Sequence, residues 1–286
     1  MMMEAGKEAL FWEKAGVYIS CLLCPHHCLI AEGKTGRCLV RRQREGKLIA
    51  EGYGRISLLG MDPVEKKPLY HFHPGSWILS AGSHGCNMRC AFCQNSAISQ
   101  NRAVTQFYEP RELLQVARRQ PRNLGLAFTY NEPLINMEYL LDTAPLFKDR
   151  GLKTVLVTNG LVCAEPLNAL LPLVDALNID VKGFSEDYYR KLGGDLPTVQ
   201  QTVAAAAGRC HVEVTTLVVP GENDGVQEME ALTEWLAAIS PEIPLHLNRF
   251  FPNYHMQNKP PTPLETLNIL AAIARRRLRH VHIGNV

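Results

Sequence analysis

The chain has 286 residues, of which 46% are hydrophobic and 20% are charged, so it can bury a large core and does not have a disordered composition. Its longest apolar runs are interrupted by Pro or Asp well before bilayer length, and its acidic N-terminus lacks the apolar segment of an export signal. A formal net charge of +2 is too small to indicate nucleic-acid binding. We therefore expect a cytoplasmic protein that neither crosses a membrane nor binds nucleic acid.

Cysteine is unusually frequent for such a protein. There are nine cysteines, and seven of them lie between Cys21 and Cys93. Reducing conditions disfavour disulfides in the cytoplasm, so closely spaced thiols there more often mark a metal or redox site. Cys163 and Cys210 stand apart, and each is expected to be a small buried apolar residue.

The first cysteine group has the spacing C-x2-C-x3-C-x9-C and consists of Cys21, Cys24, Cys28 and Cys38. Four thiolates complete the coordination of a metal, so this spacing predicts a structural or electron-relay site without an open position. A closed zinc site and an auxiliary [4Fe-4S] cluster both fit. Short cysteine knuckles around glycine turns favour zinc.

The chain divides by pattern into two parts. Residues 1–75 are rich in cysteine and then in glycine, and they show no alternation of strands and helices. We expect this segment to form a small N-terminal extension of strands and loops that carries the four-cysteine metal site. Residues 76–286 form the second part.

In the second part, short apolar or β-branched runs alternate with helical patterns, which is typical of βα units on a parallel sheet. The expected strands are residues 77–82, 124–130, 153–159, 175–181, 212–219 and 245–250, with a last short strand at 281–284. The expected helices are residues 110–119, 133–148, 165–171, 185–192, 197–207, 226–239 and 263–278. Six βα units are too few for a closed eight-stranded barrel. The predicted fold is α/β, a partial (β/α)6 TIM-type barrel with functional residues after the strand ends.

A second cysteine group follows the first of these strands. Cys86, Cys90 and Cys93 have the spacing C-x3-C-x2-C. Zinc usually requires a fourth protein ligand, and no candidate stands nearby in the sequence. An iron–sulfur cluster held by only three thiolates leaves one iron open to a small molecule. The spacing therefore indicates a catalytic iron–sulfur site.

The segment CNMRCAFC, from Cys86 to Cys93, resembles the cluster motif of the radical S-adenosylmethionine (SAM) superfamily. The resemblance implies a [4Fe-4S] cluster whose open iron binds the amino and carboxylate groups of SAM. It also implies a one-electron donor such as flavodoxin or ferredoxin, and cleavage of SAM to methionine and a 5′-deoxyadenosyl radical that abstracts hydrogen from a substrate. Phe92 would lie against the adenine, and Asn95 is a further expected cofactor contact.

Later strand ends resemble those of pyruvate formate-lyase activating enzymes. In TYNEP, Glu132 would accept hydrogen bonds from the methionine amino group, although a carboxylate at a helix N-terminus is also favoured by the helix dipole alone. The likeness places three more side chains near the methionine, around an optional monovalent cation: Thr158, Asn159 and Asp180. The same likeness implies that Lys182 points towards the sulfonium of SAM. The spacing Asp-x-Lys by itself indicates an ion pair between Asp180 and Lys182 at the end of a strand.

The fifth predicted strand departs from the activating enzymes, because Thr215 stands where they have an arginine. The contact to the SAM carboxylate or ribose must then differ, and the candidates are Thr216, Asn248 and Arg249. In the last strand Ile283 would flank the adenine. Substrate contacts are expected from His246, Arg249, Tyr254 and His255, although a lone histidine in a strand is more often structural.

Together with CPHHC and DPVEKKPLYHFHPGS, these motifs resemble the AmmeMemoRadiSam-system radical SAM proteins from about residue 17 to the C-terminus. That resemblance implies Memo-like and AMMECR-like partner proteins. The favoured function is hydrogen abstraction from a small-molecule substrate, with the N-terminal extension and the region of His71 and His73 covering the barrel mouth. One alternative is an activating enzyme with an open face that installs a glycyl radical on a partner protein. Another is a non-catalytic metal-bearing scaffold.

Overall fold

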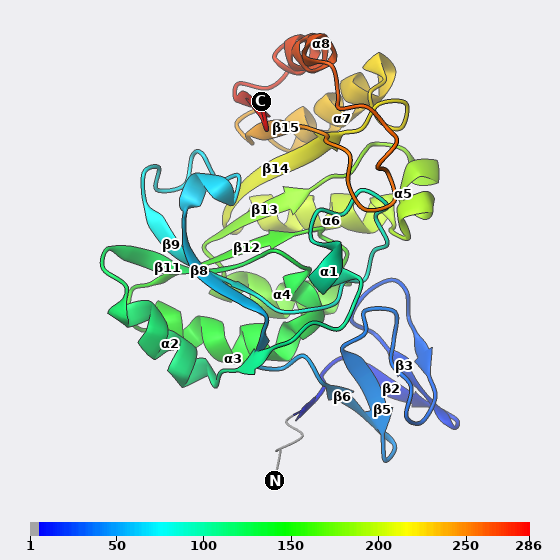
Figure 1. The fold of residues 1–286 in the computed structure, drawn as a ribbon, viewed down its shortest axis with the longest axis vertical. Helices are drawn as coiled ribbons and strands as arrows, with labels where there is room; N and C mark the ends of the chain where they lie inside the picture. Colours follow the sequence, from blue (N-terminus) through cyan, green and yellow to red (C-terminus); the bar gives the residue numbers. More distant parts are fainter. Residues whose placement is uncertain (1–5) are drawn as a thin grey trace.

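The computed structural model describes residues 6–286 and is built around one large curved sheet (Figure 1). Its eight strands have the order β16-β15-β14-β13-β12-β11-β9-β8. In chain order they are β8 (Leu58–Pro63), β9 (Trp77–Gly82), β11 (Asn123–Phe128), β12 (Lys153–Thr158), β13 (Ala176–Asp180), β14 (His211–Val218), β15 (Leu245–Arg249) and β16 (Val281–Gly284). All neighbours in this sheet pair in parallel except β8 and β9, which are antiparallel. The predicted α/β partial barrel is confirmed.

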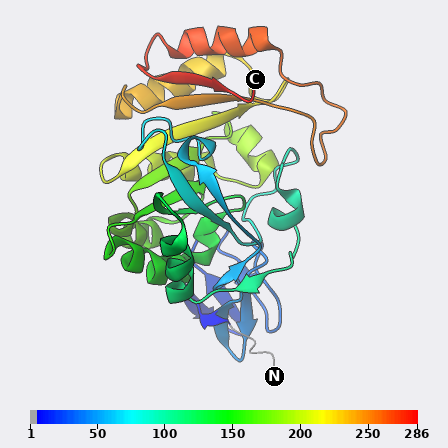
Figure 2. The same ribbon diagram turned by 60° about the vertical axis from the view of Figure 1, so that its left-hand side comes forward.

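Helices connect the parallel strands and cover the outer face of the sheet (Figure 2). They are α2 (Pro110–Arg119), α3 (Met137–Lys148), α4 (Ala164–Leu170), α5 (Glu186–Leu192), α6 (Leu196–Ala207), α7 (Val226–Ile239) and α8 (Leu264–Ala274). Helix α2 illustrates why these boundaries arise, since Pro110 occupies the first helical position and Glu109 and Glu112 form a capping box. The last helix ends at Ala274, four residues before the predicted end.

The core is the interface between these helices and the sheet. The central strands are buried on both faces, as is typical of parallel sheets, and Leu156, Leu177 and Val214 are fully buried. This is why the strands read as nearly continuous apolar runs in the sequence.

Beside the barrel the N-terminal part, in blue in Figure 1, forms two small antiparallel sheets, and one of its strands completes a third with residues 106–107. Their members are β1 (Lys7–Glu8), β2 (Trp12–Ala15), β3 (Tyr18–Cys21), β4 (Leu29–Ile30), β5 (Arg41–Arg44), β6 (Lys47–Ala50), β7 (Arg55–Ile56) and β10 (Gln106–Phe107). Strand β8 also lies in the segment assigned from the sequence to the extension, yet it is hydrogen-bonded to β9 in the main sheet.

A buried ion pair joins the N-terminal part to the barrel. Arg41 on β5 donates to both carboxylate oxygens of Glu138 on α3, at 3.0 and 3.1 Å. Their side chains are only 1% and 0% exposed. Tyr53 adds a hydrogen bond of 2.5 Å to Asp142 on the same helix. The extension is therefore packed against α3 through charged and polar contacts.

The segment between β8 and β9, residues 64–76, closes one end of the partial barrel. Glu213, near the start of β14, accepts the backbone N–H of Tyr70 at 3.0 Å and that of His71 at 2.8 Å. The Nε2 atoms of His71 and His282 are 2.8 Å apart, which ties the segment to β16 as well. His71 thus lies at the starts of the strands, opposite the strand ends, and the segment forms a floor under the barrel. The prediction that this region covers the barrel mouth is therefore wrong, because the segment crosses the other end of the sheet.

Glu213 is the central acceptor of this floor, because it also hydrogen-bonds His211 at 2.9 Å and His246 at 2.6 Å. Burial acts to raise its pKa, but these four hydrogen bonds outweigh it and lower the pKa from 4.5 to about 2. The depressed carboxyl pKa contributes stability that is present above about pH 4.5 and is lost as the pH falls towards 2.

We expect Glu213→Gln to lower the free energy of unfolding by about 2 kcal/mol at neutral pH, because buried donors lose a charged acceptor. Denaturant titrations at pH 7 and in acid measure this loss. The acid sensitivity between about pH 4.5 and 2 should shrink in the same variant. His211→Asn, which removes only a partly exposed partner, is the control and should cost less. Equal stability of Glu213→Gln and the wild type would show that the floor does not depend on this carboxylate.

Candidate active site

A cavity of about 720 Å³ lies inside the curved sheet. Seven segments that follow or end a strand contribute to its wall, among them Cys86, Glu132, Thr158, Asp180, Leu217, Asn248 and Gly284. Residues of the floor, including Lys67 and Tyr70, line its other side. The polar strand ends predicted to form a site therefore face one chamber.

The loop after β9 brings the three cysteines to this cavity, and all three border it. Hydrogen-bonding groups lie next to two of the three sulfur atoms. The backbone N–H of Met88 lies 3.4 Å from Cys86 Sγ, and the Asn159 side-chain amide lies 3.6 Å from the same sulfur. The Ser99 hydroxyl, in the short helix α1 (Ser96–Ser99), is 3.1 Å from Cys93 Sγ. Donors of this kind stabilise thiolate ligands, so the three cysteines fit an iron–sulfur cluster.

Burial raises the pKa of the Cys90 thiol to about 11, even though Lys182 nearby lowers it. Burial, together with the Glu132 carboxylate, likewise raises the pKa of Cys86. Because metal ligation requires thiolates, assembly of a cluster here must release protons.

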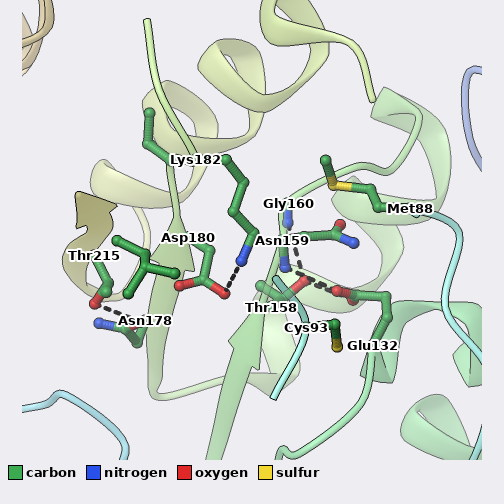
Figure 3. Close-up of polar contacts among 12 residues, drawn as sticks. Met88, Cys93, Glu132, Thr158, Asn159, Gly160, Asn178, Asp180, Lys182 and Thr215 are labelled. Atoms are coloured by element: carbon green, nitrogen blue, oxygen red, sulfur yellow. Dashed lines mark hydrogen bonds and ion pairs between the residues drawn. The ribbon is translucent and has the colours of Figure 1, made fainter. Parts of the chain in front are cut away.

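Glu132 is held by three hydrogen bonds at the edge of the cavity, and Figure 3 shows those from Thr158 and Asn159. Its Oε1 accepts from Leu134 N at 2.9 Å and from the Thr158 hydroxyl at 2.6 Å, and its Oε2 accepts from Asn159 N at 2.8 Å. Burial raises the pKa of Glu132 to about 7, although these hydrogen bonds oppose the shift. A carboxylate has about four acceptor positions, so one remains for a ligand. Glu132 both caps the helical turn that follows and borders the cavity.

Asp180 and Lys182, at and just after the end of β13, form an ion pair of 2.6 Å (Figure 3). Both border the cavity. Burial disfavours the charged amine, but Asp180 more than compensates and raises the pKa of Lys182 above its ordinary value. Lys182 is therefore a fixed cation in the chamber, and the ion-pair interpretation of Asp-x-Lys is confirmed.

Other predicted contacts also border the cavity: Phe92, Asn95, Asn159, His246 and Asn248. Asn95 additionally donates to the Tyr130 carbonyl oxygen at 2.7 Å. His246 is almost fully buried and is fixed by Glu213 from below.

Three predicted contacts lie elsewhere. Thr216 donates to the Val181 carbonyl oxygen at 2.9 Å, and its neighbours Thr215 and Leu217 face the cavity instead. Arg249 donates to Thr262 O at 2.8 Å and covers the ring of Phe251. Ile283 packs against the core. Successive side chains of a strand point to opposite faces, so a shift of one position moves a residue out of the chamber.

Tyr254 and His255 are not among the described residues that border this cavity. Their rings lie against each other with centroids 3.7 Å apart, and His255 N donates to the Ala91 carbonyl oxygen at 2.9 Å. The loop after β15 therefore packs on the loop that carries the cysteines.

The floor contributes cavity residues that the sequence did not reveal. Lys67 is 2% exposed, and its Nζ donates to Asp62 Oδ2 at 2.7 Å. Tyr130 donates to the same oxygen at 2.6 Å, and Lys67 lies 4.7 Å from the centre of its ring. The one available signal was the charged run DPVEKK, which is also typical of an exposed surface.

The N-terminal cysteines lie in a second, smaller pocket. Cys21, Cys24, Cys28 and Cys38 all line it, together with Arg41 and Asn87. Burial raises the pKa of Cys24 to about 12 and that of Cys38 to about 11. Within residues 6–286, no three His, Cys, Asp or Glu side chains are arranged as ligands of a single metal ion.

None of the helices in the described residues is long and apolar enough to span a bilayer.

The Radical SAM superfamily profile matches residues 81–236. An uncharacterized protein of Methanocaldococcus jannaschii is 39% identical over 287 residues, which cover 98% of this chain and 85% of that relative.

A pyruvate formate-lyase-activating enzyme of Clostridium pasteurianum is 27% identical over 151 residues, covering 49% of this chain and 63% of that enzyme. In fold, the chain resembles a radical SAM methyltransferase from Sphaerobacter thermophilus, with a TM-score of 0.56 at 17% identity over 74% of this chain and 67% of that one. The matched segment contains the three cysteines, Glu132 and the Asp180–Lys182 pair. The chain belongs to the radical SAM superfamily.

Proposed function

We propose that the protein cleaves SAM reductively in the 720 Å³ chamber and abstracts hydrogen from a small-molecule substrate held there. The observation that carries this proposal is that the three cysteines, Glu132 and the Asp180–Lys182 pair border one cavity. A [4Fe-4S] cluster, when bound, supplies the electron for cleavage and an iron that chelates SAM.

The residues of the chain position the cofactor. Cys86, Cys90 and Cys93 would hold three irons, and the amides near Cys86 would stabilise its thiolate. The free acceptor position of Glu132 suits the cationic amino group of SAM. Phe92 supplies an apolar surface for the adenine.

The size of the chamber favours a small-molecule substrate. A cavity of about 720 Å³ is in the range of ligand sites, and SAM with a cluster would fill a large part of it. Any substrate must enter from the strand ends, because the floor formed by residues 64–76 blocks the starts of the strands. The likeness to the pyruvate formate-lyase-activating enzyme supports the alternative, in which a glycyl radical is installed on a partner protein.

We expect Glu132→Gln to weaken SAM binding about tenfold or more, because the amino group of SAM loses a charged acceptor. In addition, the side-chain NH2 of the new glutamine would face the backbone N–H of Asn159, so that two donors would meet. Calorimetric titration of the anaerobically reconstituted protein with SAM measures the change. Glu65→Gln, a carboxylate substitution at the floor of the same cavity, is the matched control and should leave the affinity unchanged. Wild-type affinity in Glu132→Gln would mean that Glu132 acts only as a cap.

The function is tested by measuring 5′-deoxyadenosine formed anaerobically from SAM and dithionite. The assay is run with and without Memo-like and AMMECR-like proteins and a small-molecule extract of the host. Turnover that rises well above the basal rate supports a metabolite substrate and these partners. Basal cleavage unaffected by them favours the activating-enzyme alternative, and an absence of both SAM binding and cleavage favours a metal-bearing scaffold.

Three accompanying expectations belong to the same proposal. A flavodoxin or ferredoxin would serve as the electron donor, and the protein would act in the cytoplasm. A monovalent cation near Asp180 is an optional part of the SAM site.

A further inference from the structure

The pocket of the four N-terminal cysteines contains an unusual unpaired donor. Arg41 lines this pocket and is 1% exposed. Its terminal nitrogens are bound to Glu138 and Leu10, but its Nε has no hydrogen-bond partner among the described residues. A buried unsatisfied donor costs free energy, and a thiolate or inorganic sulfide in the pocket would accept this bond. The pocket is therefore built for an anionic sulfur-ligated group.

This pocket touches the catalytic cysteine loop through Asn87, the residue after Cys86, which lines the pocket. Its side-chain amide donates to the Leu161 carbonyl oxygen at 2.8 Å. Its Oδ1 also accepts from the Asn159 side-chain amide at 2.9 Å, and that amide lies 3.6 Å from Cys86 Sγ. Two asparagine side chains thus lead from the pocket of the four cysteines to the Cys86 thiol.

Further contacts fix the two loops relative to each other. His26 Nε2 lies 2.8 Å from the Asn87 carbonyl oxygen. Arg89 donates to the Cys86 carbonyl oxygen at 2.8 Å and also to the carbonyl oxygen of Arg37. The separation between the two cysteine groups is therefore set by the fold.

We infer that the four-cysteine pocket holds a [4Fe-4S] cluster that passes the reducing electron to the three-cysteine cluster. This inference rests on the proposed function. Zinc has no accessible redox change, so a zinc site could not pass an electron to the catalytic loop. The position of Asn87 thus reverses the preference for zinc that the cysteine spacing gave.

The electron balance is simple. A one-electron donor, such as reduced flavodoxin, is oxidised by one electron, which the four-cysteine cluster accepts. That cluster returns to its oxidised state when it reduces the catalytic cluster by the same electron. The electron finally enters the S–C5′ bond of SAM, which breaks to methionine and the 5′-deoxyadenosyl radical.

Metal content is the first test. Anaerobically purified wild-type protein should contain about eight irons per chain and no stoichiometric zinc, and Cys24→Ser/Cys28→Ser about four irons. Electron paramagnetic resonance of the reduced wild type should show two signals, of which only one changes on addition of SAM, because only one cluster has an open iron. One zinc and about four irons per chain would overturn the inference.

The route of the electron is the second test, and it compares two reductants. With reduced flavodoxin, Cys24→Ser/Cys28→Ser should form 5′-deoxyadenosine at least about tenfold more slowly than the wild type. With titanium(III) citrate, a small reductant that reaches the catalytic cluster directly, both proteins should react at similar rates. Cys210→Ala, which removes a thiol outside both groups, is the control and should match the wild type with either reductant.

Asn87→Ala keeps all seven cysteines, so it tests the relay even if Cys24→Ser/Cys28→Ser does not fold. It should retain about eight irons and still be slowed more with flavodoxin than with titanium(III) citrate. Equal slowing with both reductants would show that the pocket is structural and would overturn the relay. If the wild type contains two clusters but cleaves no SAM with titanium(III) citrate, the proposed function fails while the cluster assignment stands.

Discussion

The Cys90→Ala variant is expected to form no detectable 5′-deoxyadenosine, which is the largest effect on activity that the structure predicts. Cys90 is one of three thiols at the cavity, and a cluster left with two protein ligands would not assemble in a form that binds SAM. Iron analysis should show the loss of about one cluster per chain. Chromatography of the anaerobic reaction with dithionite measures the nucleoside.

The control for this experiment is Cys210→Ala. Cys210 lies outside both cysteine groups, and its thiol faces the Ala206 carbonyl oxygen at 3.6 Å. This variant should keep its iron and its activity. Continued SAM cleavage by Cys90→Ala would show that the reaction does not use the three-cysteine loop.

The largest expected effect on stability comes from Arg41→Met, which should lower the free energy of unfolding by about 3–5 kcal/mol. The substitution leaves the Glu138 carboxylate 0% exposed and without its cation, and desolvation of an unpaired charge is costly. Denaturant titration of the wild type and the variant, followed by circular dichroism, measures the difference.

The exposed pair between Lys7, on β1, and Asp142, on the same helix α3, offers a matched control. Its side chains are 43% and 35% exposed, so Lys7→Met should cost at most about 1 kcal/mol. Arg41→Met/Glu138→Met should recover part of the loss, because no charge then remains buried. If Arg41→Met is as stable as Lys7→Met, the buried pair does not hold the extension to the barrel.

The sequence predicted the parallel strands well because burial on both faces leaves a simple signal. Strands such as β12 and β13 are short apolar runs that end in polar residues, and no tertiary information is needed to find them. Strand β8 was not predicted, because it is an antiparallel edge strand that contains Gly60 and ends at Pro63, and both residue types weaken the sequence signal of a strand. Its pairing with β9 depends on a contact between distant parts of the fold.

The site was predictable where one segment carries several functional residues. The three cysteines share one loop, and Glu132 lies next to Pro133 at a strand end, so local spacing was sufficient. Thr216 was chosen on the wrong face because the orientation of a strand residue depends on the register of the whole sheet. Lys67 and Asp62 could not be predicted, since their burial arises only when residues 64–76 cross beneath the barrel.

The floor under the barrel has a consequence for the order of folding. Its hydrogen bonds join Tyr70 and His71 to Glu213 across 143 and 142 positions of the chain, and His71 contacts His282 across 211 positions. Contacts of such long range form late, because they require most of the chain to be present. During synthesis, all seven cysteines of the two groups emerge well before β14 and β16. Ligand loops for both metal sites can therefore form in a nascent chain whose reaction chamber has not yet closed.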